Sequence, residues 1–200
     1  MKGVNDPHAN ARVYSAGAPI ESAKGAVIAL HGRGAAAASM LELASALAGD
    51  RLACLAPEAG ANTWYPHSFL KPAEQNEPWL SSAIACVRRT LAMVIGGGVS
   101  ADRIALIGFS QGACLASEFV VRNPGRFGAL MALSGGVIGP PGTTWEVDGD
   151  LEGTPIRRSR DAGFHSGFCS ERLLNIHIRG KDWCMEFWTS LSSARETRPA

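Results

Sequence analysis

The sequence predicts an α/β protein: a single domain in which helices cover both faces of a mostly parallel β-sheet. Short, continuous apolar runs, typical of buried strands, alternate with segments whose apolar residues recur at helical spacing. Strands that alternate with helices imply β-α-β units and therefore a parallel sheet. A length of 200 residues is ordinary for one domain with a full core. We expect strands at 26–31, 52–56, 103–107 and 129–133, and helices at 36–48, 79–95 and 111–122.

The predicted elements follow one another with recognisable ends. The first apolar run leads into His31-Gly32-Arg33-Gly34, and an Ala-rich segment that favours helix comes next. The longest predicted helix is supported by apolar residues three or four positions apart and ends at three consecutive glycines, 96–98. Before it, residues 57–78 form a long loop rich in Pro and Asn, and loops of this length are usually functional.

The strand expected at 103–107 runs directly into Gly108-Phe109-Ser110-Gln111-Gly112, and a helix-patterned segment follows at once. In this strand–turn–helix context, G-x-S-x-G predicts a nucleophile elbow. The turn is so sharp that side chains at Gly108 and Gly112 would collide with the neighbouring strand and helix. Ser110 would be held in a strained turn with its hydroxyl exposed, at the positive end of the helix. We therefore expect Ser110 to be a catalytic nucleophile.

Attack by a serine on an acyl carbonyl creates a tetrahedral oxyanion, which needs two backbone N–H donors. One comes from the residue after the nucleophile, here Gln111, and the other from the loop after an earlier strand. The residue at Arg33 is the natural second donor, because Gly32 and Gly34 allow the loop to turn back beneath the elbow. The alternative is that residues 31–34 form an ordinary turn at a strand end, with His31 as a structural histidine.

Five segments together resemble the phospholipase/carboxylesterase family, the acyl-protein-thioesterase-like branch of the α/β-hydrolases. They occur in family order between about residue 26 and residue 156: Leu30-His-Gly-Arg-Gly-Ala, Leu55-Ala-Pro-Glu-Ala, Asn62-Thr-Trp-Tyr-Pro-His-Ser-Phe, Gly108-Phe-Ser-Gln-Gly-Ala-Cys-Leu-Ala and Leu133-Ser-Gly-Gly-Val-Ile-Gly. The resemblance implies an α/β-hydrolase fold and a serine esterase without a cofactor or metal. Its substrates would be carboxylic esters, thioesters or lysophospholipids.

The same resemblance implies that Trp64, Tyr65 and Phe69 line or flank the acyl pocket. The alternative is that these aromatic side chains only anchor the long loop to the core.

The C-terminal quarter departs from the family pattern. The triad of this fold follows the chain order Ser, Asp, His. Asp161 stands where the acid is expected, 51 residues after Ser110, but no apolar strand leads into it. His165 is only four residues further on. His177 lies in a β-like run and is our candidate for the base, although it could equally be a strand histidine packed on a structural face.

Composition also changes after Ile156. Residues 157–200 hold 8 of the 19 Lys and Arg residues, in Arg-rich sequence without apolar periodicity. A frameshift in a G+C-rich gene produces such sequence, and we take it as a hypothesis that the DNA sequence would test. We thus describe 1–200 as one α/β-hydrolase domain, family-like to about 156, with an atypical tail at 157–200. Two functions stay open: a serine carboxylesterase that uses Ser110, or a catalytically impaired hydrolase-fold protein that binds acyl ligands or a partner.

Overall charge and cysteine usage limit the partners and the compartment. The net charge of +1 gives no reason to expect binding to nucleic acid or acidic lipid. The first residues lack the apolar region of a signal peptide, and we expect no membrane span. The five cysteines lack metal-ligand spacing and are expected to be free thiols in a reducing cytoplasm: Cys54, Cys86, Cys114, Cys169 and Cys184. Because an atypical tail would uncover part of the sheet, we expect a homodimer.

Overall fold

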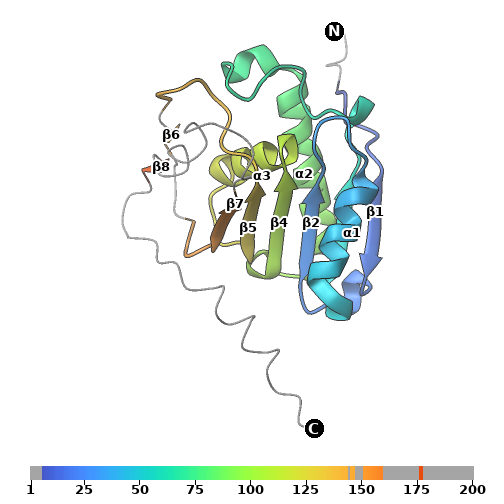
Figure 1. The fold of residues 1–200 in the computed structure, drawn as a ribbon. Coiled ribbons are helices and arrows are strands. Elements are labelled where there is room, and N and C mark those ends of the chain that lie inside the picture. The colour runs from blue at the N-terminus through green and yellow to red at the C-terminus, as the bar shows by residue number, and fades with distance from the viewer. Residues whose placement is uncertain (1–5, 144, 147–150, 160–175, 178–200) are drawn as a thin grey trace.

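The computed structural model describes residues 6–143, 145–146, 151–159 and 176–177. Its main feature is a six-stranded sheet with the strand order β1-β3-β2-β4-β5-β7 (Figure 1). The strand β1 pairs antiparallel with β3, and every other pairing in this sheet is parallel. The strands are β1 (Val13–Gly17), β2 (Ala26–Leu30), β3 (Ala53–Pro57), β4 (Ile104–Phe109), β5 (Ala129–Leu133) and β7 (Ile156–Ser159).

Three α-helices cover the two faces of the sheet, as the sequence predicts. The helix α1 (Ala37–Ala48) packs on one face, where Met40 and Ala44 meet Ile107 of β4. On the other face lie α2 (Trp79–Gly96) and α3 (Gln111–Arg122), which contribute Leu80 and Phe119 to the larger core cluster. Figure 1 shows α1 in front of the sheet and α2 and α3 behind it. Short 3-10 helices occupy Ile20–Ser22, Gly49–Arg51, Gly60–Asn62, Ala73–Asn76 and Ala101–Arg103.

The parallel register brings the ends of several strands to one edge of the sheet. Leu30, the last residue of β2, pairs with Gly108 of β4. One position further on, Phe109 pairs with Leu133 of β5, and Leu133 pairs with Ser159 of β7. The strands β2, β4, β5 and β7 therefore all end at the same edge, where ligands bind in open α/β sheets.

All four predicted strands and three predicted helices are confirmed, with ends that shift by at most two residues. Two strands of the main sheet were not predicted from the sequence, β1 and β7. The sequence has no apolar strand before Asp161, but a strand without an apolar run, β7, ends at Ser159. Its sequence, Ile-Arg-Arg-Ser, carries little apolar signal, but strand pairing uses the backbone, and β7 pairs with β5 over four residues.

Two further strands form a separate pair. The strands β6 (Trp145–Glu146) and β8 (Ile176–His177) are parallel to each other and lie on the β7 side of the molecule in Figure 1. Within the β-like run that contains His177, Ile176 and His177 thus form a short strand, outside the main sheet.

The helix α2 is the one helix in the described part of the chain that is long and apolar enough to cross a membrane, with a mean hydropathy of 1.2. The length and composition of α2 alone therefore do not support our expectation of no membrane span. Eight of its residues are buried against the rest of the domain, and Arg89 forms an ion pair with Asp6 at 3.6 Å. These contacts are those of a core helix, so its composition is weak evidence for a membrane span. Of the cysteines, Cys54, Cys86 and Cys114 are buried and form no disulfide with one another, and Cys169 and Cys184 lie outside the described residues.

Candidate active site

Ser110 is the single residue between the end of β4 and the start of α3. Its backbone has φ 52° and ψ −112°, a conformation that a residue with a side chain rarely adopts. Two hydrogen bonds hold it there: the Ser110 N–H donates to the Leu133 carbonyl at 2.8 Å, and the Ser110 carbonyl accepts from the Cys114 N–H at 3.1 Å. The residue is exposed, and its hydroxyl does not cap the helix. The backbone therefore turns sharply between a strand and a helix, which is the conformation that a nucleophile elbow requires.

The two glycines of the motif are required by close approach. A Cβ at Gly108 would lie 2.3 Å from the Gly112 carbonyl oxygen, and a Cβ at Gly112 would lie 2.2 Å from the Leu30 carbonyl oxygen. Both distances are far inside van der Waals contact. The elbow therefore packs α3 against β4 and β2 backbone to backbone, as the sequence predicted.

Two backbone N–H groups next to the elbow have no protein acceptor among the described residues: those of Gln111 and Arg33. Gln111 is the first residue of α3, and the first N–H groups of a helix lack intrahelical partners. Arg33 lies in the loop after β2, and this loop is adjacent to Ser110. A Cβ at Gly32 would lie 3.6 Å from the Ser110 Cβ and 3.2 Å from the Phe109 ring.

His31 is a structural residue of this loop. It is fully buried, and its Nε2 accepts a hydrogen bond from the Ala59 N–H at 3.0 Å. Because Nε2 is an acceptor, the ring proton is on Nδ1, which donates to the Gly32 carbonyl at 2.8 Å. Both ring nitrogens are thus engaged, and His31 has no free nitrogen with which to take a proton from Ser110. The structural interpretation of His31 is confirmed, while the role of the Arg33 N–H remains a prediction.

The Arg33 side chain binds the long loop. Its guanidinium donates from Nη1 to the Pro66 carbonyl and from Nη2 to the His67 carbonyl, both at 2.8 Å. It also lies over the Tyr65 ring, 5.9 Å from the centroid. The charged guanidinium of Arg33 therefore holds the long loop.

The aromatic residues predicted near the acyl pocket are not equivalent. Trp64 and Tyr65 are fully buried in the core, with exposed fractions of 0% and 1%, which favours the alternative that they anchor the loop. The Trp64 Nε1 donates to the His31 carbonyl at 2.8 Å. Burial and the neighbouring Cys114 raise the pKa of the Tyr65 hydroxyl, which therefore stays neutral. Phe69 is only partly buried and packs at the edge of the core, so it is the one of the three with surface to offer a ligand.

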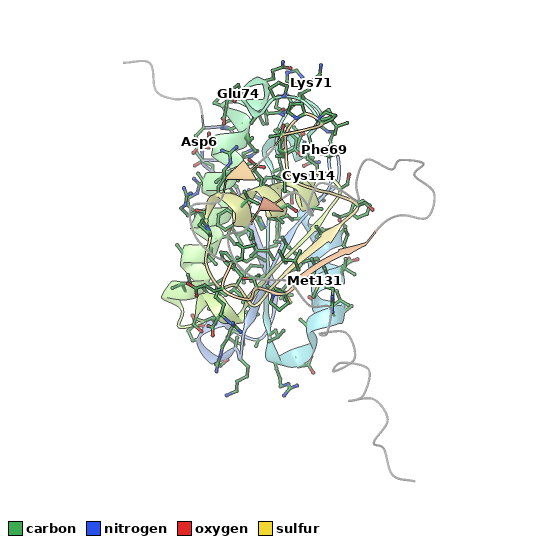
Figure 2. The ribbon with its side chains drawn as sticks, turned by 90° about the vertical axis from the view of Figure 1, so that its left-hand side faces the viewer. Asp6, Phe69, Lys71, Glu74, Cys114 and Met131 are labelled. Atoms are coloured by element: carbon green, nitrogen blue, oxygen red, sulfur yellow. The ribbon has the colours of Figure 1, made fainter. Side chains whose placement is uncertain are left out.

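Figure 2 shows where these residues lie along the sheet. Cys114, in the first turn of α3, is close to the end of the molecule that carries Phe69, and Met131 of β5 lies well below it. Asp6, Lys71 and Glu74 are also at the upper end. Asp6 and the long loop thus lie at the same end of the molecule as Cys114, which is four residues after Ser110.

The Gln111 side chain is a feature that sequence reasoning missed. Only 6% of the residue is exposed, and its carboxamide makes three hydrogen bonds to three consecutive residues of the long loop. The Oε1 atom accepts from the Trp64 N–H at 3.0 Å and from the Thr63 hydroxyl at 3.3 Å. The Nε2 atom donates to the Tyr65 carbonyl at 2.7 Å.

His8 is a second buried histidine, and no sequence pattern singles it out. Its Nδ1 accepts from the Gly60 N–H and its Nε2 donates to the Trp64 carbonyl, both at 3.0 Å. Burial is the main cause that lowers the pKa of His8. The sequence of residues 6–12 does not predict this role, because both partners of the ring are distant in sequence.

The remaining candidates lie outside what the structure describes in full. Asp161 and His165 are not among the described residues, and only the backbone of His177 is described, in β8. The predicted acid and base therefore stay predictions. Among the described residues, no group of three His, Cys, Asp or Glu side chains is arranged to hold a metal ion.

Comparison with known proteins decides the family. The model of the family named Phospholipase/Carboxylesterase matches residues 10–156. The chain belongs to the phospholipase/carboxylesterase family. A phospholipase/carboxylesterase from Dyadobacter fermentans, for which there is a crystal structure, is 38% identical in sequence to this family member. The two structures have a TM-score of 0.74, and the match covers 82% of this chain and 78% of that one. The fold of this family member is accordingly the α/β-hydrolase fold.

More distant structures share the fold with this family member. Esterase PE8 is 22% identical, with a TM-score of 0.58 over 74% of this chain and 73% of its own. SOBER1 from Arabidopsis thaliana is also 22% identical, with a TM-score of 0.51 over 67% of this chain and 72% of its own. No curated protein sequence matches the chain significantly. The family match ends at residue 156, the position after which the sequence departs from the family pattern.

Proposed function

We propose that this family member is a serine carboxylesterase that hydrolyses carboxylic esters or thioesters through an acyl-enzyme on Ser110. The observation that carries the proposal is the elbow itself. It presents an exposed serine in a strained conformation beside two backbone N–H groups that have no acceptor among the described residues. Strained residues of this kind cluster at active sites. The similarity to the Dyadobacter fermentans phospholipase/carboxylesterase supports the same reaction class.

In the first step the Ser110 Oγ attacks the acyl carbonyl carbon, and a histidine takes the hydroxyl proton. The carbonyl oxygen becomes an oxyanion, which the N–H groups of Arg33 and Gln111 would stabilise. The positive end of α3 adds to this stabilisation. The carbon–oxygen or carbon–sulfur bond of the leaving group then breaks, and the imidazolium returns the proton to that group. Water, activated by the same histidine, hydrolyses the acyl-enzyme.

The sheet register supports Asp161 as the acid. Phe109, Leu133 and Ser159 form one row across β4, β5 and β7, so β7 ends at the edge where Ser110 follows Phe109. Asp161 is two residues beyond the end of β7. An acid that follows a strand at this edge, after the serine in chain order, fits the arrangement of α/β-hydrolases.

The choice of base narrows to the histidines that follow the acid. His8 and His31 have both ring nitrogens bound to the backbone. His67 precedes the serine, whereas the chain order of this fold places the base last. His177 is our proposed base, and His165 is the competing residue.

One observation favours the alternative of an impaired hydrolase that binds acyl ligands. The family match ends before Asp161 and His177, so neither triad partner is covered by it. A protein with an intact elbow but no competent base would keep only the residual catalysis of its oxyanion donors and binding site, ~10³–10⁴-fold over water.

Hydrolysis of p-nitrophenyl esters distinguishes the two functions. We expect turnover by the wild type, and a loss of about 10³-fold or more in kcat in Ser110→Ala, because removal of the nucleophile leaves only the residual catalysis. The kcat of His177→Ala should fall by as much, and that of His165→Ala by much less. A wild type that is no faster than Ser110→Ala would contradict the esterase proposal and favour the binding protein.

A further inference from the structure

The proposed mechanism uses the backbone N–H of Gln111 but gives no role to its side chain. An oxyanion donor needs only a backbone N–H, which any residue except proline provides. A buried carboxamide, however, is unfavourable unless its polar atoms are hydrogen-bonded. Here all three of its hydrogen bonds go to residues 63–65, a segment that is 46 to 48 positions away in the chain.

Residues 59–67, which we name the strap, are bound in turn to the loop that carries Arg33. The Gly34 N–H donates to the Asn62 carbonyl at 2.8 Å, and the Trp64 Nε1 donates to the His31 carbonyl at the same distance. The Ala59 N–H donates to His31, and the Arg33 guanidinium donates to Pro66 and His67. These bonds join the strap to residues 31, 33 and 34.

We propose that the Gln111 carboxamide is a positioning group that fixes the Arg33 loop relative to the elbow. The backbone of Gln111 supplies one N–H beside Ser110, and its side chain holds the strap that holds the loop with the second N–H. One residue thereby sets the separation of the two donors. The positioning role stands on these contacts alone, and its effect on catalysis rests on the proposed function.

The test compares Gln111→Met with Glu118→Gln. Methionine keeps the length of glutamine but makes none of the three hydrogen bonds. Glu118 is a matched control, because it lies on the same helix, is 3% exposed, and bonds to a different loop through the Ile138 N–H at 3.0 Å. Gln111→Glu is the second variant in case methionine prevents folding: it keeps an acceptor for the Trp64 N–H but puts an oxygen against the Tyr65 carbonyl.

The first readout is hydrogen exchange at the Gly34 amide, measured by NMR on the free protein, which requires no activity. We expect Gln111→Met to accelerate this exchange about tenfold or more and Glu118→Gln to leave it near the wild-type rate. The second readout is esterase kinetics, in which kcat should fall about 10–100-fold while KM changes less than about threefold, because a displaced oxyanion donor acts in the transition state.

The outcomes separate the two proposals. If the Gly34 amide exchanges faster in Gln111→Met than in the wild type, but the wild type hydrolyses no ester, the positioning role stands and the esterase function is removed. Unchanged Gly34 exchange in a folded Gln111→Met or Gln111→Glu variant would overturn the positioning role whatever the activity. Equal acceleration in Glu118→Gln would also overturn it, since the loop would then respond to general loss of stability.

Discussion

At the scale of single residues, Ser110 combines an unfavourable backbone with an exposed hydroxyl. A non-glycine residue in such a conformation costs on the order of 1–3 kcal/mol and persists only when its surroundings hold it. The bonds to Leu133 and Cys114 and the backbone contact of Gly112 with β2 provide that support. The strain thus keeps the hydroxyl out of the helix cap and open to a substrate.

Substitutions in the loop after β2 test whether the Arg33 N–H is an oxyanion donor. Gly34 has φ +74°, and a Cβ there would contact nothing within 4 Å, so Gly34→Val acts through backbone strain rather than collision. We expect the loop to shift and kcat to fall ~10²–10³-fold, the usual effect of losing one donor. Arg33→Ala keeps the N–H, so its kcat should stay within about tenfold of the wild-type value. Thermal unfolding measurements check that both variants fold. A folded Gly34→Val enzyme with unchanged kcat would show that this loop holds no oxyanion donor.

The residue types of the elbow could be predicted because local sequence sets them. Glycine is needed at positions 108 and 112 for lack of space, and a serine between a strand and a helix is a local pattern. The side-chain partners of Gln111, His8 and His31 could not be predicted, because each partner is brought near by the tertiary fold. The burial of Trp64 and Tyr65 could not be predicted either, because the sequence around a loop aromatic residue does not show whether it anchors the loop or lines a pocket.

At the scale of elements, the apolar pattern predicts what is buried. The strands β2 and β4 lie inside the sheet, and helices cover both of their faces, so their sequences are continuously apolar. The strand β1 pairs on one side only and is largely exposed, and β7 has arginines where the inner strands have aliphatic residues. Both are held by backbone pairing with a neighbour, which leaves little trace in side-chain type.

At the scale of the whole molecule, the N-terminal segment supports the site from outside the sheet. His8 holds Gly60 and Trp64 of the strap, and its ring packs against Trp64 and Trp79. Its backbone N–H donates to the Ser82 hydroxyl, which bonds to Asp6, and Arg89 contacts both Asp6 and the His8 carbonyl. This cluster ties residues 6–8 to α2 and to the strap at once.

Stability should fall in mild acid because of His8. Its pKa is lowered in the fold, chiefly by burial, so below about pH 6.5 the unfolded chain binds more protons at this position than the folded one. The contribution of neutral His8 is complete above that pH and is lost as the pH falls towards the lowered value. The Asp6 carboxylate, which faces it, keeps its charge in this window, since the hydrogen bond from Ser82 lowers the pKa of Asp6.

We therefore expect the free energy of unfolding of the wild type to decrease between pH 7.5 and 5.5, mostly below about pH 6.5, with a slope of at most about 1.4 kcal/mol per pH unit for this one proton. His8→Gln should be less stable at pH 7.5 but should show a smaller decrease, because glutamine does not titrate. Urea unfolding at both pH values measures the two slopes, and equal slopes would remove His8 as the cause.

In the proposed mechanism the elbow makes the Ser110 hydroxyl, and no other, a nucleophile. Its most direct test is reaction of the full-length protein with a fluorophosphonate, followed by intact mass and peptide mapping, with Ser110→Ala as the control. We expect one phosphonyl group per chain, on Ser110, and none on the variant. A folded wild type that is not labelled, or a label that persists in Ser110→Ala, would contradict it.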